Sequence, residues 1–314
     1  MKSIPGIALL VALTFGLLVA APVAVDSSSP RLAAYYDRFL ALYGDSVFEW
    51  SDSVTPVKRI AGIKQVGVGQ SNSYALTKKG ELLAWDDDPA ESIVLANKVS
   101  SFYAGRTALL VIRNDGELPQ FDTRGLFRFG EKLASESNTI ADNILTAAVG
   151  DSANYYVTRD GALFVLGRAH RGQCGDGKLT ASASYVQTTA DVAQVVAHTG
   201  HALILKRDGT VWGTGGNICG PLGRHGLGDK AIKWGLSVDD VQAIATGSTH
   251  SLATKRHQSL WIWGRNEGLE PKHVLGKVSA VATGSSSTLA LSQGSLWQWS
   301  PGEQPRSIMK CADI

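Results

Sequence analysis

The sequence predicts an all-β protein that folds as a seven-bladed β-propeller. Residues 241–264 divide into three apolar runs of strand length, which polar turn residues separate. This unit recurs along the chain as seven degenerate repeats of about 34–49 residues. The copies align on one anchor position each: Tyr35, Gly69, Gly105, Gly150, His198, Gly247 and Gly284. A small sheet that cannot bury both faces alone needs copies of itself as neighbours, and seven such sheets form a propeller.

The first two strands of each unit are indicated by small residues and by tight turns. Alanine is frequent in the first strand, as at 147–148, which suits strands that crowd around a central axis. The anchor that follows is glycine in five units, which favours either a positive φ or a close approach of another backbone. The second strand ends at an Asp-Gly pair at 115–116, 160–161 and 208–209, a dipeptide typical of two-residue hairpin turns.

The third strand carries large aromatic side chains, which we expect to fill the space between blades. These side chains are Phe48, Trp50, Trp85, Phe121, Phe164, Trp212, Trp261, Trp263, Trp297 and Trp299. The fourth strand has the weakest signal and is indicated at 55–60 and 301–309. Proline in both segments suits an outer edge strand, because the missing N–H then faces solvent.

The units resemble the regulator-of-chromosome-condensation repeat. That repeat reads roughly Val-x-x-Val-Ala-x-Gly-x-x-His-Ser-Leu-Ala-Leu-x-x-Asp-Gly-x-Val-Trp-x-Trp-Gly, and it is clearest at 241–266, 193–228 and 278–299. Glycine-rich segments at 171–177 and 213–223 are similar to the tail that follows the third strand in this family. The resemblance covers about residues 31–310 and implies the same propeller fold.

The resemblance also carries expectations about particular residues and functions. It implies that His201 and His250 form hydrogen bonds within their blades, and that one chain terminus adds strands to the blade begun by the other. The member that names the family is a nuclear guanine-nucleotide exchange factor that binds chromatin. Secreted members inhibit β-lactamases through aromatic residues in the links after the anchors. Those links are mostly Ser, Thr and Asn here, so a secreted enzyme inhibitor is the least favoured interpretation.

Residues 1–24 differ from the repeats. Lys2, an apolar run at 7–21 and small residues before position 25 are typical of a secretory signal peptide, with a retained membrane anchor as the alternative. We therefore expect a single propeller domain over 25–314 that is exported to the periplasm or the medium. We expect this domain to be monomeric and without stable membrane insertion. The 30 Lys and Arg against 28 Asp and Glu give no electrostatic reason for nucleic-acid binding.

Two of the three cysteines lie in the tails of successive repeats. Cys174 and Cys219 would then stand side by side on adjacent blades, and in an exported protein this placement favours a Cys174–Cys219 disulfide. The alternative is that both are free and act as small hydrophobic residues. Cys311 would remain unpaired.

The favoured function is that of a non-catalytic scaffold that binds an unknown protein partner. Insertions on a rigid scaffold often carry function, and the loops after the third strands of units four and five are the longer ones. Their candidate binding residues are Arg168, His170, Arg171, Arg224, His225 and Trp234. Trp234 lies outside the strand pattern, so it is either an exposed anchor or a side chain folded back onto its own blade.

The alternative function is that of an envelope hydrolase or lyase that acts on a polar polymer. It would need Arg38, Arg106 and Asp151 to converge on one pocket at the mouth of the channel. The spacing of the chain indicates no catalytic group, no metal site and no cofactor, so we regard enzyme activity as the less favoured interpretation.

Overall fold

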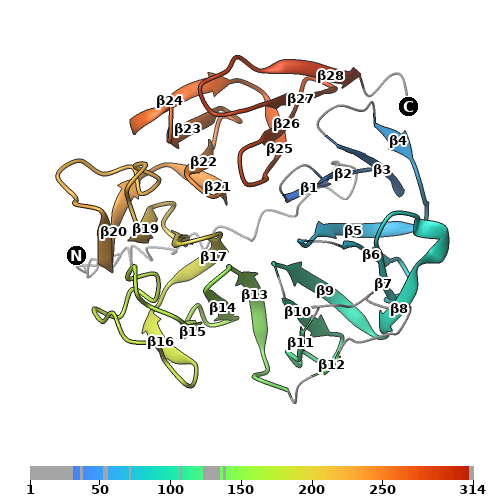
Figure 1. The fold of residues 1–314 in the computed structure, drawn as a ribbon, viewed down its shortest axis with the longest axis horizontal. Coiled ribbons are helices and arrows are strands. Elements are labelled where there is room, and N and C mark those ends of the chain that lie inside the picture. Colours follow the sequence, from blue (N-terminus) through green and yellow to red (C-terminus); the bar gives the residue numbers. More distant parts are fainter. Residues whose placement is uncertain are drawn as a thin grey trace, which may run out of the picture.

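The computed structural model describes residues 31–35, 38–51, 56–70, 72–106, 108–122, 135–136 and 139–310. These residues form seven four-stranded sheets that stand as blades around a central axis (Figure 1), so the predicted fold is confirmed. Strands run antiparallel and in sequence order within each sheet. The predicted signal segment and Cys311 lie outside the described residues. No helix of the described chain is long and apolar enough to span a membrane.

The blades have the following strands. Blade 1 consists of β1 (Arg31–Tyr35), β2 (Arg38–Tyr43), β3 (Ser46–Ser51) and β4 (Val57–Lys58). Blade 2 consists of β5 (Ile63–Val68), β6 (Ser73–Thr77), β7 (Leu82–Trp85) and β8 (Ile93–Ala96), with the 3-10 helix η1 (Pro89–Glu91) before β8. Blade 3 consists of β9 (Val99–Ala104), β10 (Ala108–Arg113), β11 (Gln120–Asp122) and β12 (Ser135–Glu136). Blade 4 consists of β13 (Ile144–Val149), β14 (Ala153–Thr158), β15 (Leu163–Gly167) and β16 (Val186–Thr189). Blade 5 consists of β17 (Val192–Ala197), β18 (His201–Lys206), β19 (Val211–Gly216) and β20 (Lys230–Val238). Blade 6 consists of β21 (Val241–Thr246), β22 (His250–Lys255), β23 (Leu260–Gly264) and β24 (Gly268–Leu275). Blade 7 consists of β25 (Val278–Thr283), β26 (Thr288–Ser292), β27 (Ser295–Trp299) and β28 (Arg306–Lys310).

Glycine anchors let neighbouring blades approach closely. Gly105 and Gly150 follow β9 and β13, and neither has a positive φ. A Cβ atom on Gly105 would lie 2.2 Å from Cγ1 of Val149, and one on Gly150 would lie 2.8 Å from the carbonyl oxygen of His198. Both contacts are with the next blade, so close approach explains these glycines. A positive φ is found instead at the hairpin glycines, for example 96° at Gly161.

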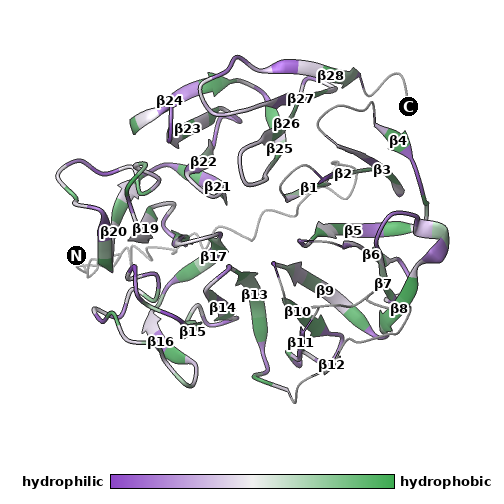
Figure 2. Cartoon of the chain, in the orientation of Figure 1, coloured by the Kyte–Doolittle hydropathy of each residue, from purple (hydrophilic) through white to green (hydrophobic). Residues whose placement is uncertain are grey.

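Apolar side chains fill the space between blades. Figure 2 shows apolar residues along inner strands such as β13 and polar residues in many of the loops. Trp85, Trp263 and Trp299 are almost completely buried, as predicted for third-strand aromatics. Trp261 is only half-buried, and the ammonium group of Lys255 lies 4.8 Å from its ring centroid. Some aromatics of the third strand therefore pack between blades, while others cover the outer part of their own blade.

The ring closes without exchange of strands in the described part of the chain. Blade 1 is built wholly from β1 to β4 and blade 7 wholly from β25 to β28, and β1 contacts β25 (Figure 1). Phe39 and Trp50 of blade 1 belong to one apolar cluster with Leu289 and Leu296 of blade 7. The indole Nε1 of Trp50 donates a hydrogen bond to Oε1 of Gln298 at 3.1 Å. Side-chain packing thus replaces the strand exchange that the family resemblance implied.

His201 and His250 connect neighbouring blades. Nε2 of His201 lies 2.5 Å from Oγ1 of Thr246 in blade 6, and Nε2 of His250 lies 3.1 Å from Oγ1 of Thr288 in blade 7. Burial lowers the pKa of His201 to about 3 and the pKa of His250 to about 4, so both rings are neutral at pH 7. The expectation of hydrogen bonds within the blade was wrong, because each ring extends from its own β-strand toward the next blade.

Candidate functional site

The links after the anchors and the loops after the third strands emerge at the same end of the propeller. In blade 4 the amide of Arg168 donates to the carbonyl of Ser152 at 2.8 Å, and in blade 5 the amide of Gly216 donates to the carbonyl of Gly200 at 2.8 Å. These bonds hold the start of each long loop against the anchor link of its own blade. We call this end of the molecule the tail-loop face.

A pocket of about 150 Å³ opens on the tail-loop face where blades 4, 5 and 6 meet. Arg171, from the blade 4 loop, lies over the blade 5 backbone, because a Cβ atom on Gly200 would be 3.0 Å from its Cδ. Arg168 and His170 are exposed on the same loop. The pocket is lined by Arg171, Gly200, His201, Gly216, Ile218, Cys219, Pro221, Ser248 and Thr249.

Ile218 is the most exposed large apolar residue of this pocket and was missed by the sequence analysis. Its relative exposure is 71%, the highest among the exposed large hydrophobic residues of the described chain. It lies in the blade 5 loop, where an isolated apolar residue follows no strand or helix period that could be detected. The one feature of the sequence that could have indicated an exposed Ile218 is its position in the glycine-rich tail at 213–223.

Arg224 and His225 are not among the residues that line this pocket. Nε2 of His225 lies 2.7 Å from a carboxylate oxygen of Glu270 in blade 6, with both side chains largely exposed. Arg224 is half-buried against Gly235 of β20, and its Nε atom is buried without a hydrogen-bond partner among the described residues. Burial lowers the pKa of the Arg224 guanidinium. The six predicted binding residues therefore do not form one continuous site.

Trp234 is a packing residue of the seam between blades 4 and 5. It lies in β20, packs against the apolar cluster that includes Tyr155 and Cys174, and is half-buried. Its Nε1 atom lies 3.3 Å from Oγ1 of Thr188, to which it donates a hydrogen bond. A Cβ atom on Gly175 would lie 2.3 Å from that Nε1 atom. Trp234 therefore folds onto the neighbouring blade, which is neither of the two predicted placements.

Cys174 and Cys219 are free thiols in the structure. Cys174 is buried in the apolar cluster beneath Trp234, whereas Cys219 is half-buried and lines the pocket on the tail-loop face. Burial raises the pKa of the Cys174 thiol to about 11. The two side chains occupy different environments, and the predicted disulfide between them is not formed.

The three residues of the alternative channel-mouth site lie in three different places. Arg38 forms an ion pair with Asp86, with Nη2 and Oδ1 3.5 Å apart. Nε of Arg106 donates to Oε1 of Gln70 at 2.9 Å on the surface. Only Asp151 reaches the channel, where it lines the cavity along the axis. None of the pockets found among the described residues brings the two arginines and this carboxylate together.

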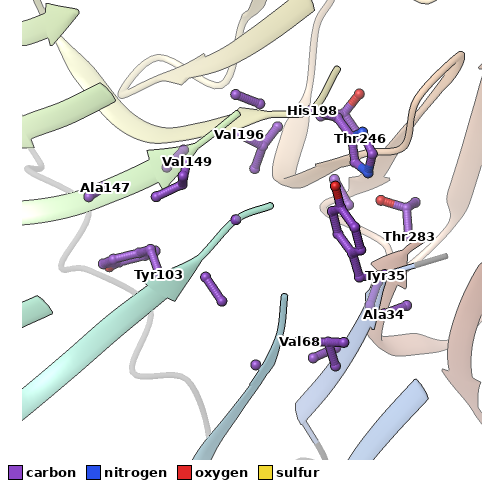
Figure 3. A pocket seen from close by; sticks show the side chains of 18 of the residues that line it. Ala34, Tyr35, Val68, Tyr103, Ala147, Val149, Val196, His198, Thr246 and Thr283 are labelled. Carbon is purple, nitrogen blue, oxygen red and sulfur yellow. The ribbon is translucent and has the colours of Figure 1, made fainter. Parts of the chain in front are cut away.

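The central channel contains a cavity of about 330 Å³. Figure 3 shows Tyr35 and His198 at its edge, where their rings stack with centroids 5.5 Å apart. The Tyr35 hydroxyl donates to Oδ1 of Asp151 at 3.2 Å. Tyr35 and His198 were identified from the sequence only as repeat anchors. No group of three or more His, Cys, Asp or Glu side chains that could hold a metal ion occurs in the described residues.

Comparison with curated proteins finds partial similarity to several large proteins. The chain is 32% identical to human E3 ubiquitin-protein ligase HERC2 over 206 residues, which cover 55% of this chain and 4% of the ligase. It is 24% identical to the ultraviolet-B receptor UVR8 of Arabidopsis thaliana over 242 residues, which cover 67% of this chain and 55% of the receptor. The chain thus spans about half of the receptor and a small part of the ligase. No family model matches it.

Solved structures share the fold. Human WBSCR16 superposes with a TM-score of 0.70 and 16% identity, covering 81% of this chain and 84% of that chain. Prp20p from Saccharomyces cerevisiae superposes with a TM-score of 0.69 and 16% identity, covering 83% of this chain and 82% of that chain. The superposition extends over most of both chains, so the similarity concerns the whole ring.

Proposed function

Because the chain belongs to the regulator-of-chromosome-condensation repeat family, we propose that it is a non-catalytic scaffold that binds a protein partner. Protein binding is known for similar propellers. Yeast Prp20p has reported binding properties to Gsp1p and to histones. In another structure, Kap60 is bound to the same yeast protein. These partners belong to the yeast protein, and the partner of this chain has to be found by experiment.

The observation that carries the proposal is the combination of Ile218 and Arg171 at one pocket. Ile218 is 71% exposed, and Arg171 forms no ion pair with any described carboxylate. Arg168 and His170 on the same loop likewise form no ion pair with a described carboxylate. An apolar centre with arginine beside it is a common composition of protein interfaces. We infer a partner that inserts an apolar side chain into the pocket and places an acidic residue next to it.

The separation of Arg38, Arg106 and Asp151 supports the non-catalytic part of the proposal. A polymer hydrolase or lyase would require these charges to act on one substrate group, and the three side chains have different local partners. No second observation favours the alternative enzyme.

The test is affinity capture with the mature protein and two matched double variants. Arg171→Ala/Ile218→Ala removes the charge and the apolar side chain at the pocket. Lys79→Ala/Val94→Ala removes the same two types of side chain from exposed positions of blade 2. We expect one protein to be retained by the wild type and by the blade 2 variant, and to be lost with the pocket variant. Higher salt should also weaken capture, because screening reduces the attraction between exposed charges.

Two results would contradict the proposal in different ways. Equal capture by the pocket variant would show that the partner binds another surface. Failure of the folded wild type to retain any protein from extracts of its own cells would contradict the scaffold function itself.

Export is a separate part of the proposal and rests on the signal-like pattern at residues 1–24. Amino-terminal sequencing of protein recovered from the periplasm or the medium should begin close to position 25. A mature protein that retains Met1 and stays inside the cell would contradict export and leave the binding site to be tested independently.

A further inference from the structure

The central cavity has apolar walls and a very limited set of charges. Its lining comes from the inner strands of all seven blades, and half of the lining residues are alanine or valine. Among the lining residues that the structure describes, Asp151 is the only carboxylate and there is no lysine or arginine. A pocket of this size with few polar groups is typical of a site for a small molecule. An anion would be repelled by Asp151 and would find no lysine or arginine among the described lining residues.

Most of the other polar groups in the lining already have partners in the fold. Gln65 exchanges two hydrogen bonds with the backbone of Phe102, and Gln194 does the same with Ile244. These bonds connect neighbouring blades and use one donor and one acceptor of each amide. Three further polar side chains lie together at one end of the cavity, those of Tyr35, Asp151 and His198.

Tyr35 and His198 are the two anchors that are not glycine, and they meet across the axis. Their rings stack at an interplanar angle of 14°, although they come from blades 1 and 5 (Figure 3). The bond from Tyr35 to Asp151 adds blade 4 to the same cluster. Three blades thus contribute one aromatic and acidic rim to the cavity.

His198 presents a hydrogen-bond donor without a partner. Its Nδ1 atom accepts the backbone N–H of Thr199 at 2.9 Å, so the neutral ring carries its proton on Nε2. That Nε2 atom is inaccessible to solvent and has no hydrogen-bond partner among the described residues. Burial lowers the pKa of His198, which favours this neutral form. A buried donor without an acceptor is unfavourable, so an acceptor from a ligand would stabilise the site.

We propose that the channel mouth binds a small, planar, uncharged aromatic molecule with an amide-type edge. The carbonyl oxygen of such a molecule accepts from Nε2–H of His198 once a side-chain rotation exposes this buried atom, and its N–H group donates to the carboxylate of Asp151. The aromatic body lies against the apolar wall of the cavity and the ring of Tyr35. This site is separate from the pocket at Arg171 and Ile218, so its test does not depend on whether a protein partner binds there.

The test uses benzamide and benzoate, which have the same shape and differ in charge. We expect saturable binding of benzamide in an NMR titration of the wild type, and binding of benzoate that is at least about tenfold weaker because Asp151 repels it. His198→Phe keeps an aromatic ring and removes the donor, so the affinity for benzamide should fall about fivefold, the effect of one lost hydrogen bond. His225→Phe makes the same change on the surface and should bind benzamide like the wild type.

A second variant keeps the proposal testable if His198→Phe does not fold. Asp151→Asn removes the negative charge and should bring the affinity for benzoate close to that for benzamide. The proposal is overturned if the folded wild type shows no saturable binding of benzamide. It is also overturned if benzoate binds as tightly as benzamide, or if a folded His198→Phe variant retains full affinity for benzamide.

Discussion

The seam between blades 5 and 6 contains a buried polar network, whereas the seam that closes the ring between blades 7 and 1 depends on large apolar side chains. At the first seam, His201 bonds to Thr246, and the carbonyl of Pro221 accepts from both Ser251 and Trp263 at 2.8 Å. At the closing seam, the apolar cluster is accompanied by the hydrogen bond from the indole of Trp50 to Gln298.

The difference follows from what the repeat supplies to each blade. His201 and His250 occupy the same repeat position, and each reaches a threonine of the following blade. In blade 7 that position is Ser287, a shorter side chain that is buried but forms no hydrogen bond to blade 1 among the described residues. The seams that follow blades 5 and 6 thus share a histidine-to-threonine bond from one repeat position, whereas the closing seam is held by residues of its own.

The largest expected effect comes from truncation at the closing seam. Trp50→Ala removes a 4% exposed aromatic side chain and the donor of a hydrogen bond to Oε1 of buried Gln298. The free energy of unfolding should fall by about 3–5 kcal/mol, as for large core aromatics elsewhere. Urea denaturation followed by tryptophan fluorescence and circular dichroism measures the change.

The matched control is Trp261→Ala. This side chain is half-buried on the outer part of blade 6 and lies beneath Lys255. Its removal should cost clearly less than that of Trp50. Equal losses would show that the closing seam has no special dependence on its large side chains.

The second effect is a loss of stability in mild acid, which comes from His201 and His250 at the seams that follow blades 5 and 6. The pKa values of about 3 for His201 and about 4 for His250 lie below the value of about 6.5 expected in the unfolded chain. The unfolded state therefore binds protons first as the pH falls, so stability is complete above pH 6.5 and declines between there and pH 4. At about pH 5.5 each histidine should account for roughly 1.4 kcal/mol of this loss.

Thermal unfolding midpoints between pH 8 and pH 5 can separate the histidines from the carboxylates. The double variant His201→Gln/His250→Gln starts from a lower midpoint, but that midpoint should change little between pH 7 and pH 5.5. A variant with the same acid dependence as the wild type would assign the loss to other groups.

The sequence predicted the fold well because its signals are local and repeated. The anchor spacing and the Asp-Gly turns mark seven meanders, and the structure places an inner strand directly before each glycine anchor. The spacing of the repeats does not indicate whether a side chain points toward the next blade. His201 and Trp234 were therefore assigned to their own blades or to solvent, whereas packing between blades determines where both lie.

The candidate sites were predicted less well. Arg171 was recognised as a loop residue, but Ile218 beside it follows no period and was missed. Tyr35 and His198 were both identified as departures from glycine, yet their contact depends on the curvature of the whole ring. Local spacing contains no information about a contact between blades 1 and 5.

The smallest effect distinguishes the hydrogen bond of the closing seam from its apolar packing. Gln298→Leu has a similar volume and leaves the buried Nε1–H of Trp50 without an acceptor. The free energy of unfolding should fall by about 1–2 kcal/mol, the usual effect of an unpaired buried donor, and by less than in Trp50→Ala. Urea denaturation of the two single variants and of the double variant gives the coupling energy between the two side chains. If Gln298→Leu is as stable as the wild type, the closing seam is held by apolar contact alone.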